Sequence, residues 1–227
     1  MYSLQQRAML KSLSLKKLYL WYSERSFWKL KNKTITEIFT DIYNNTAETY
    51  NPDIETYIDQ LVSFIQENKV QSVLDIGCGD FKMMSRVIRK VDINYIGIDV
   101  VEDMIKHHQQ LHGAMKTDFL FLDAIDEELP DAELVIIRQV LQHLSNAQIQ
   151  KILSKLSKFK YVIITEEMLS DDSTEPNVDK IPGPHIRTSL LSSVFIDLPP
   201  FNVKNAKVLF EYFEEPTVIR TYLVTNP

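Results

Sequence analysis

The chain has 227 residues, of which 44% are hydrophobic, and a formal net charge of −6 at pH 7. This length and hydrophobic content suit one α/β domain with an appendage and argue against two full domains. The single cysteine, Cys78, excludes an intrachain disulfide and a cysteine-based zinc site, and no apolar run approaches the roughly 18 residues of a membrane-spanning helix.

The charge is unevenly distributed along the chain. Residues 1–33 carry eight Lys or Arg and one Glu, a net +7, which leaves −13 to the remaining residues. Because nucleic-acid affinity depends on cations placed along a phosphate backbone, the acidic body predicts no nucleic-acid partner. The basic leader has three interpretations: a cap whose aromatic side chains pack over a ligand cleft, an anchor that lies on anionic lipid or on a partner protein through Trp21 and Trp28, or a targeting peptide. We expect a cytoplasmic protein, with peripheral membrane contact through the leader as the alternative.

Between Thr34 and Glu67, apolar residues recur every three or four positions, which predicts two amphipathic helices. The break falls near Asn51-Pro52, since proline suits a first helical turn. With the leader, these helices form a predicted N-terminal helical extension or cap over residues 1–69.

From residue 70 onwards, short apolar runs alternate with helical stretches, and we expect the main domain to occupy residues 70–227. The predicted helices include Lys82 to Val91 and Ala147 to Phe159. The predicted strands are "SVLDIG", "NYIGIDV", "TDFLFLD", "ELVIIRQV" and "KYVIITEE". This βαβαβ order predicts a parallel sheet that is covered by helices on both faces.

The last sixty residues break the alternation. Residues 168–202 are punctuated by prolines and have no clear period, which is typical of a functional lid or binding loop. Two strand-like runs follow, "AKVLFEYFEE" and "VIRTYLVTN", with Pro216 and Thr217 between them. They predict an antiparallel hairpin at the edge of the sheet.

The stretch "SVLDIGCGDFKMM" predicts a buried strand, a glycine turn and a helix. Gly77 and Gly79 allow close approach of the backbone to a ligand, and Asp99, at the end of the next strand, is placed to accept hydrogen bonds from ribose hydroxyls. Lys82 stands where a dinucleotide fold needs glycine, and no Gly-Lys-Ser/Thr is present, so a pyrophosphate or triphosphate is disfavoured. Asp75 favours a nucleoside ligand that carries an ammonium or sulfonium group.

These residues resemble the class I S-adenosylmethionine-dependent methyltransferases. "VLDIGCGDF", "YIGIDV", "FLFLDAID" and "LPDAELVIIRQVLQHLS" are similar to four motifs of that family, in the family's order, and a small branch shares the GCGDF form and a late PPFN. The resemblance implies a Rossmann-like fold with a seven-stranded, mostly parallel sheet, a C-terminal antiparallel hairpin and additional N-terminal helices. The cofactor that it implies is S-adenosyl-L-methionine. The chain departs from the commonest motif at Phe81, where the family has glycine.

The resemblance also implies roles for single residues. Asp75, Gly77 and Gly79 would lie under the methionine moiety and Asp99 would bind the ribose. Asp123 with Ala124 would meet the adenine, against which Val100 would pack. Arg138 and Gln139 would line the methionine side or the mouth for the acceptor, and Phe81 would close over the methionine end or face the acceptor.

Methyl transfer needs little from the protein beyond positioning, but a hydroxyl acceptor gains from a general base. The candidates are His143 after the fourth strand, Glu166 at the end of the fifth, and His185 in the 168–202 insert, which we expect to act as a substrate lid. The alternative for each is a packing, pairing or solvated role. Arg187 of the insert is a candidate substrate contact. We expect no metal, because the tandem Asp171-Asp172 is of a kind that is usually only solvated in loops.

The predicted function is therefore S-adenosylmethionine-dependent O-methylation of a sugar hydroxyl in a glycan or glycolipid, with a glycosyltransferase as a possible partner for the leader. The polar side chains of the insert favour a polyhydroxy acceptor. Methylation of a small metabolite or a protein side chain is the first alternative. A non-catalytic nucleoside-binding module is the second.

Overall fold

The structure is a computed structural model that describes residues 33–45, 54–113, 116–170, 175–214 and 217–227. The predictions for the leader, for the break at Asn51-Pro52 and for the Asp171-Asp172 pair lie outside these residues.

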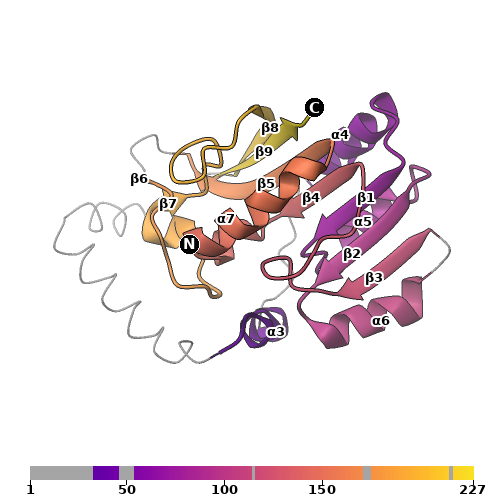
Figure 1. The fold of residues 1–227 in the computed structure, drawn as a ribbon, viewed down its shortest axis with the longest axis horizontal. Helices are drawn as coiled ribbons and strands as arrows, with labels where there is room; N and C mark the ends of the chain where they lie inside the picture. The colour runs from indigo at the N-terminus through magenta and orange to yellow at the C-terminus, as the bar shows by residue number, and fades with distance from the viewer. Residues whose placement is uncertain (1–32, 46–53, 114–115, 171–174, 215–216) are drawn as a thin grey trace.

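A seven-stranded sheet of order β3-β2-β1-β4-β5-β9-β8 forms the centre of the molecule (Figure 1). Its strands are β1 (Ser72–Ile76), β2 (Asn94–Asp99), β3 (Thr117–Phe121), β4 (Leu134–Arg138), β5 (Tyr161–Leu169), β8 (Ala206–Glu214) and β9 (Thr217–Thr225). The first five are parallel, whereas β9 pairs antiparallel with both β5 and β8. The predicted Rossmann-like sheet and the terminal hairpin at its edge are confirmed.

Both faces of the sheet are buried, as the near-continuous apolar strands require. Along β4, Leu134 and Ile136 belong to one hydrophobic cluster, together with side chains of α4 (Ile54–Glu67) and α5 (Lys82–Val87). Val135 and Ile137 belong to the other, which includes α7 (Asn146–Lys155). The strand's alternation thus divides the core into two layers.

The helices between the strands lie where the sequence predicts them, with shifted ends. α5 is four residues shorter than expected, and residues 88–90 form turns instead. α6 (Glu102–His112) connects β2 to β3. α7 begins in a capping box in which Ser145 and Gln148 exchange side-chain and backbone hydrogen bonds, and it ends in the 3-10 turn η2 (Leu156–Lys158).

The two N-terminal helices occupy different positions. Tyr57, Ile58 and Leu61 of α4 are at most 2% exposed, so α4 is part of the sheet's own core. α3 (Ile35–Asn45) lies instead beyond the carboxyl ends of β1 and β2, apart from the sheet's two covered faces (Figure 1).

The described residues of the insert after β5 form a small substructure. It holds a two-stranded parallel pair, β6 (Glu175–Pro176) with β7 (Ser192–Ser193), and the 3-10 turn η3 (Arg187–Leu190). Asn177 fixes its later part by donating to the carbonyls of Phe195 and Pro199 at 2.8 and 2.9 Å.

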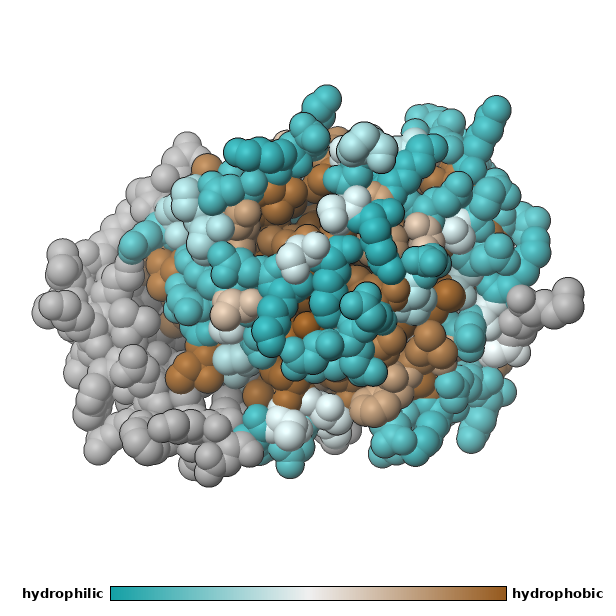
Figure 2. Space-filling model, viewed as in Figure 1, coloured by the Kyte–Doolittle hydropathy of each residue, from teal (hydrophilic) through white to brown (hydrophobic). Residues whose placement is uncertain are grey.

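The face that carries α7 is largely hydrophilic, with hydrophobic side chains visible in the gaps between polar ones (Figure 2). Lys151 and Lys158, on the outer side of this region, pair with Asp126 and Asp131. No helix in the described part of the chain is both long and apolar enough to cross a bilayer.

Candidate active site

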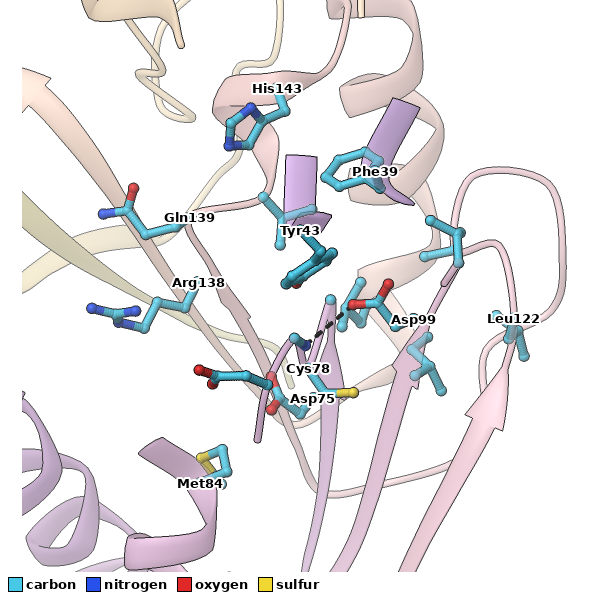
Figure 3. A pocket seen from close by; sticks show the side chains of 18 of the residues that line it. Phe39, Tyr43, Asp75, Cys78, Met84, Asp99, Leu122, Arg138, Gln139 and His143 are labelled. Atoms are coloured by element: carbon cyan, nitrogen blue, oxygen red, sulfur yellow. Dashed lines mark hydrogen bonds between the residues drawn. The ribbon is translucent and has the colours of Figure 1, made fainter. Parts of the chain in front are cut away.

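A cavity of about 710 Å³ lies at the carboxyl ends of the parallel strands (Figure 3). Its walls come from the glycine loop after β1, the end of β2, the turn after β3, the end of β4, and one side of α3. This is the edge at which open α/β sheets bind ligands, and the volume falls within the usual range for small-molecule pockets.

The glycine loop has backbone geometry that only glycine adopts without strain. Gly77 and Gly79 have φ values of 73° and 56°. A Cβ atom on Gly77 would stand 2.5 Å from Cγ2 of Val140, and one on Gly79 would stand 2.7 Å from the hydroxyl of Tyr43. The loop therefore needs both glycines for its φ angles and for the close approach of its neighbours.

Two buried carboxyl groups flank this loop. Asp99 accepts hydrogen bonds from the N–H groups of Gly79 and Val101 at 3.2 and 3.1 Å, and Asp75 accepts one from the hydroxyl of Tyr95 at 2.7 Å. Burial raises the pKa of Asp99 to about 6 and that of Asp75 to about 7. Because burial disfavours their ionised forms, both groups would gain from a hydroxyl donor or a cation in the cavity.

The adenine-side candidates also line the cavity. They are Val100, Asp123 and Ala124. Oδ1 of Asp123 accepts from the N–H of Ile125 at 2.8 Å and so shapes the turn after β3. One oxygen of Asp123 is thus used within the turn.

The helix α3 closes one side of the cavity, whereas the sequence predicts an N-terminal cap without identifying this helix or its face. Ile35, Phe39 and Tyr43, spaced four residues apart on one helix face, all line it. Tyr43 lies close to Asp99, and burial together with the charge of Asp99 raises the pKa of Tyr43 above its ordinary value. The amphipathic pattern of residues 34–45 reveals the helix, but only its place in the fold tells which face meets a ligand.

The turn after β4 brings Arg138, Gln139 and His143 to the cavity. The guanidinium of Arg138 lies 5.3 Å from the ring centroid of Tyr57, and its Nε is buried without a hydrogen-bond partner in the described structure. Gln139 has a left-handed φ of 59°. Non-glycine residues in that region cluster at functional sites.

His143 stands in the 3-10 turn η1 (Leu141–His143) and touches the ring of Phe39 edge-on at 5.8 Å between centroids. Its Nδ1 lies 3.2 Å from the carbonyl oxygen of Gly183, so in the neutral ring Nδ1 carries the proton. Burial lowers the pKa of His143 to about 4. The ring is therefore neutral near pH 7, with Nε2 as its basic nitrogen.

Glu166 does not line the cavity, which corrects the expectation of a catalytic role. It is fully buried and accepts hydrogen bonds from the backbone N–H groups of Val140, Leu141 and Gln142 at 3.2, 2.8 and 3.2 Å. The carboxyl group is thus used to hold the start of η1.

Arg187 and Phe81 are also placed away from the cavity lining. Arg187 is fully buried and donates to the carbonyls of Val178 and Leu144, so it is not available to an acceptor. Phe81 has a φ of 60°, is 3% exposed, and packs against Phe119 at 4.8 Å between ring centroids. Its left-handed backbone turns the ring into the core, so it neither closes over the methionine end nor faces the acceptor.

His185 is exposed on the insert and is not among the residues that line the cavity. Within the described ranges, no group of three His, Cys, Asp or Glu side chains is arranged to hold a metal ion. Of the predicted site residues, the structure thus brings together the eight cofactor candidates with Gln139 and His143, and separates them from Glu166, His185, Arg187 and Phe81.

Comparison with known proteins agrees with this geometry. Residues 73–159 match the family model of the methyltransferase domain. No curated protein matches the chain in sequence.

Solved structures resemble the fold at low sequence identity. The N-terminal domain of EvdMO1, solved in the presence of SAH and D-fucose, is 14% identical over 79% of this chain and 85% of that one, with a TM-score of 0.55. Magnesium protoporphyrin IX methyltransferase (ChlM) from Synechocystis PCC 6803 with bound SAM is 14% identical over 87% and 99%, with a TM-score of 0.57. The N-methyltransferase NodS from Bradyrhizobium japonicum WM9 is 11% identical over 78% and 98%, with a TM-score of 0.55.

Proposed function

The chain is an S-adenosylmethionine-dependent methyltransferase with the class I fold, and on this premise we propose that it methylates a hydroxyl oxygen of a small acceptor, with His143 as the general base. The observation that carries the proposal is the position of His143 in the cavity wall and the hydrogen bond of its ring. Its Nδ1 is engaged by Gly183 and its ring lines the cavity, so Nε2 can take a proton from an acceptor there.

The glycine loop and its acids suit the cofactor. Asp99 would accept from the ribose hydroxyls. The left-handed backbone of Gly77 and Gly79, which carry no side chains, leaves room for the methionine moiety. Asp75 would lie near the positive groups of that moiety. Arg138, whose buried Nε has no partner in the described structure, would bind its carboxylate.

When bound, S-adenosylmethionine supplies an electrophilic methyl group on a sulfonium centre. The acceptor oxygen bonds to the methyl carbon, the carbon–sulfur bond breaks with its electron pair left on sulfur, and the hydroxyl proton passes to Nε2 of His143. Because the lowered pKa keeps His143 neutral, the base is available at physiological pH. The aromatic and aliphatic side chains of α3 would exclude water from this step.

A carbohydrate is the acceptor class that we propose to test first. The sequence favours a sugar acceptor because of the polar side chains of the insert. In the structure, two of these side chains, Arg187 and Ser192, are fully buried and so do not support a sugar acceptor. The remaining support comes from Gln139 in the cavity wall and from the fold's likeness to the EvdMO1 domain solved in the presence of SAH and D-fucose. The wall formed by α3 favours a small acceptor over a long glycan.

The test compares His143→Gln with His185→Ala, which removes the exposed imidazole outside the cavity. Turnover with S-adenosylmethionine would be followed on a panel of free sugars, phenols and amines, and SAH affinity would be measured by calorimetry. We expect His143→Gln to lower kcat about 100-fold or more on a hydroxyl acceptor with SAH affinity intact, and His185→Ala to behave as wild type. Full turnover of His143→Gln, or transfer to amines alone, would exclude the proposal. Binding of SAH without turnover on any acceptor would favour the non-catalytic module.

A further inference from the structure

Residues 177–187 of the insert wrap around the turn that carries His143. The backbone carbonyl of His143 accepts from Nζ of Lys180 and from the N–H of Gly183, each at 3.0 Å. The carbonyl of Leu144, the next residue, accepts from Arg187 at 2.7 Å. We call residues 177–187 the clasp.

The clasp also reaches the start of α7. Oδ1 of Asp179 accepts from the N–H of Asn146 at 2.7 Å, and the side chain of Asn146 donates to the carbonyl of Asn177 at 2.8 Å. Together with the Gly183 contact to Nδ1, the clasp bonds both the main chain and the ring of His143. Glu166 holds the opposite end of η1, so the turn is fixed at its N–H groups by a buried acid and at its carbonyls by buried cations.

Two basic side chains are buried against this one short turn, and their burial carries a cost in desolvation free energy. Lys180 is 7% exposed and Arg187 is fully buried. Desolvation of a charge costs several kcal/mol unless hydrogen bonds and nearby charges offset it, and a backbone carbonyl can be satisfied by an N–H group, as Gly183 shows. Lys180 thus adds a side-chain donor to the main-chain donor of Gly183, and the two together tie the clasp to the His143 turn.

We propose that Lys180 is a positioning residue for the proposed reaction: its buried side chain, bonded to the carbonyl of His143, ties the clasp to the η1 turn and so holds the His143 ring at the cavity. This inference rests on the proposed role of His143 as the base. On this proposal, residues 177–187 position His143 and do not contact the acceptor.

The charge of Lys180 also acts on the His143 ring, so the pKa of His143 is a readout of the contact between them. Burial lowers the pKa of His143 first, the Gly183 hydrogen bond opposes this, and the charge of Lys180 lowers the pKa further. The other charged groups near the turn are Arg187 and Asp179 on the clasp and Glu166 on β5, while α3 presents the uncharged ring of Phe39. Burial and the charge of Arg187 bring the pKa of Lys180 itself down to about 7, so Lys180 is charged in the range near pH 4 where His143 titrates.

The experiment uses Lys180→Met, which keeps the length of the chain without the charge, and Lys180→Arg, which keeps charge and donors. Lys204→Met serves as the control, because Lys204 is exposed and lies outside the clasp. The His143 pKa would be read from its ring resonances by NMR titration, with His143→Gln used to assign them. This readout needs neither cofactor nor turnover. kcat, KM for S-adenosylmethionine and SAH affinity would be measured in parallel.

We expect Lys180→Met to raise the His143 pKa and to lower kcat about tenfold to a hundredfold, as small misplacements of catalytic groups do, with SAH affinity unchanged. Lys180→Arg should retain the wild-type pKa and most of kcat. A wild-type pKa and kcat in Lys180→Met would overturn the inference, and so would an equal loss of stability in both folded variants with the pKa of His143 and kcat unchanged. If Lys180→Met moves the pKa while His143→Gln keeps full turnover, the proposed base is wrong but the clasp stands.

Discussion

Replacing Glu166 separates its structural role from the catalytic role that its sequence position suggests. Glu166→Ala would leave three buried N–H groups, those of Val140, Leu141 and Gln142, without their acceptor. Each orphaned buried donor costs about 1–3 kcal/mol, so we expect a loss of at least about 3 kcal/mol in the free energy of unfolding. Glu166→Gln keeps one carbonyl oxygen for the pair of N–H groups that share Oε1, and it should be tolerated far better.

The two variants also differ in their pH dependence. Burial raises the pKa of Glu166 from its ordinary 4.5 to about 7, against the pull of the three N–H groups. Since the folded pKa is the higher one, the stability that the group contributes is fully present below pH 4.5 and is lost as the pH rises through 7. The shift corresponds to about 3 kcal/mol. Relative to wild type, Glu166→Gln should therefore gain about that amount between pH 4.5 and pH 8.

Urea unfolding followed by circular dichroism at several pH values measures this difference, in which the contributions of Asp75 and Asp99 cancel because both proteins share them. Turnover and SAH binding of Glu166→Gln complete the test. A stability difference that does not vary with pH would refute the electrostatic reasoning. If Glu166→Gln folds and binds SAH but has no turnover, Glu166 has a catalytic role after all.

Three further predictions concern the cavity and its neighbour Phe81. Asp99→Ala should weaken SAH binding about tenfold to a hundredfold, as expected for loss of a hydrogen bond to a charged group, and calorimetry that finds equal affinities would remove Asp99 from the ribose site. Arg138→Met should weaken SAH but leave 5′-methylthioadenosine, which lacks the carboxylate, unaffected; equal losses for both ligands would mean that Arg138 acts on the fold and not on the carboxylate. Phe81→Gly should lower the free energy of unfolding by about 2–4 kcal/mol. This is less than the loss for most aromatic deletions, because glycine adopts the left-handed φ of this position without strain. SAH affinity and KM for the acceptor should stay as in wild type. A change in either constant without a change in stability would return Phe81 to the site.

The sequence predicts the sheet and its ligand edge well, because both depend on short-range patterns. Apolar runs of strand length, the helical period and the Pro-Thr turn are local, and the strands they predict match the structure within a few residues. The position of Gly77 and Gly79 between a strand and a helix is likewise local. Asp99 follows from the end of the next parallel strand, since carboxyl ends of parallel strands meet at one edge.

The direction of a side chain at the end of an element depends on contacts that sequence spacing does not contain. Glu166 ends the predicted fifth strand as a catalytic acid would, but β5 continues to Leu169. The N–H groups of residues 140–142, more than twenty positions earlier, hold the Glu166 carboxyl away from the cavity. Arg187 is drawn inward by the carbonyls of Leu144 and Val178. Phe81 stands in the family's glycine position, and only the aromatic cluster around Phe119 decides that its ring packs into the core.

The sequence by itself thus determined the fold, the cofactor loop and His143 as a candidate base, because these follow from local pattern and chain order. The tertiary structure alone decided that α3 closes the cavity and that the insert clasps the His143 turn. Both depend on long-range packing and on buried polar groups, which must find partners wherever the fold brings donors and acceptors together.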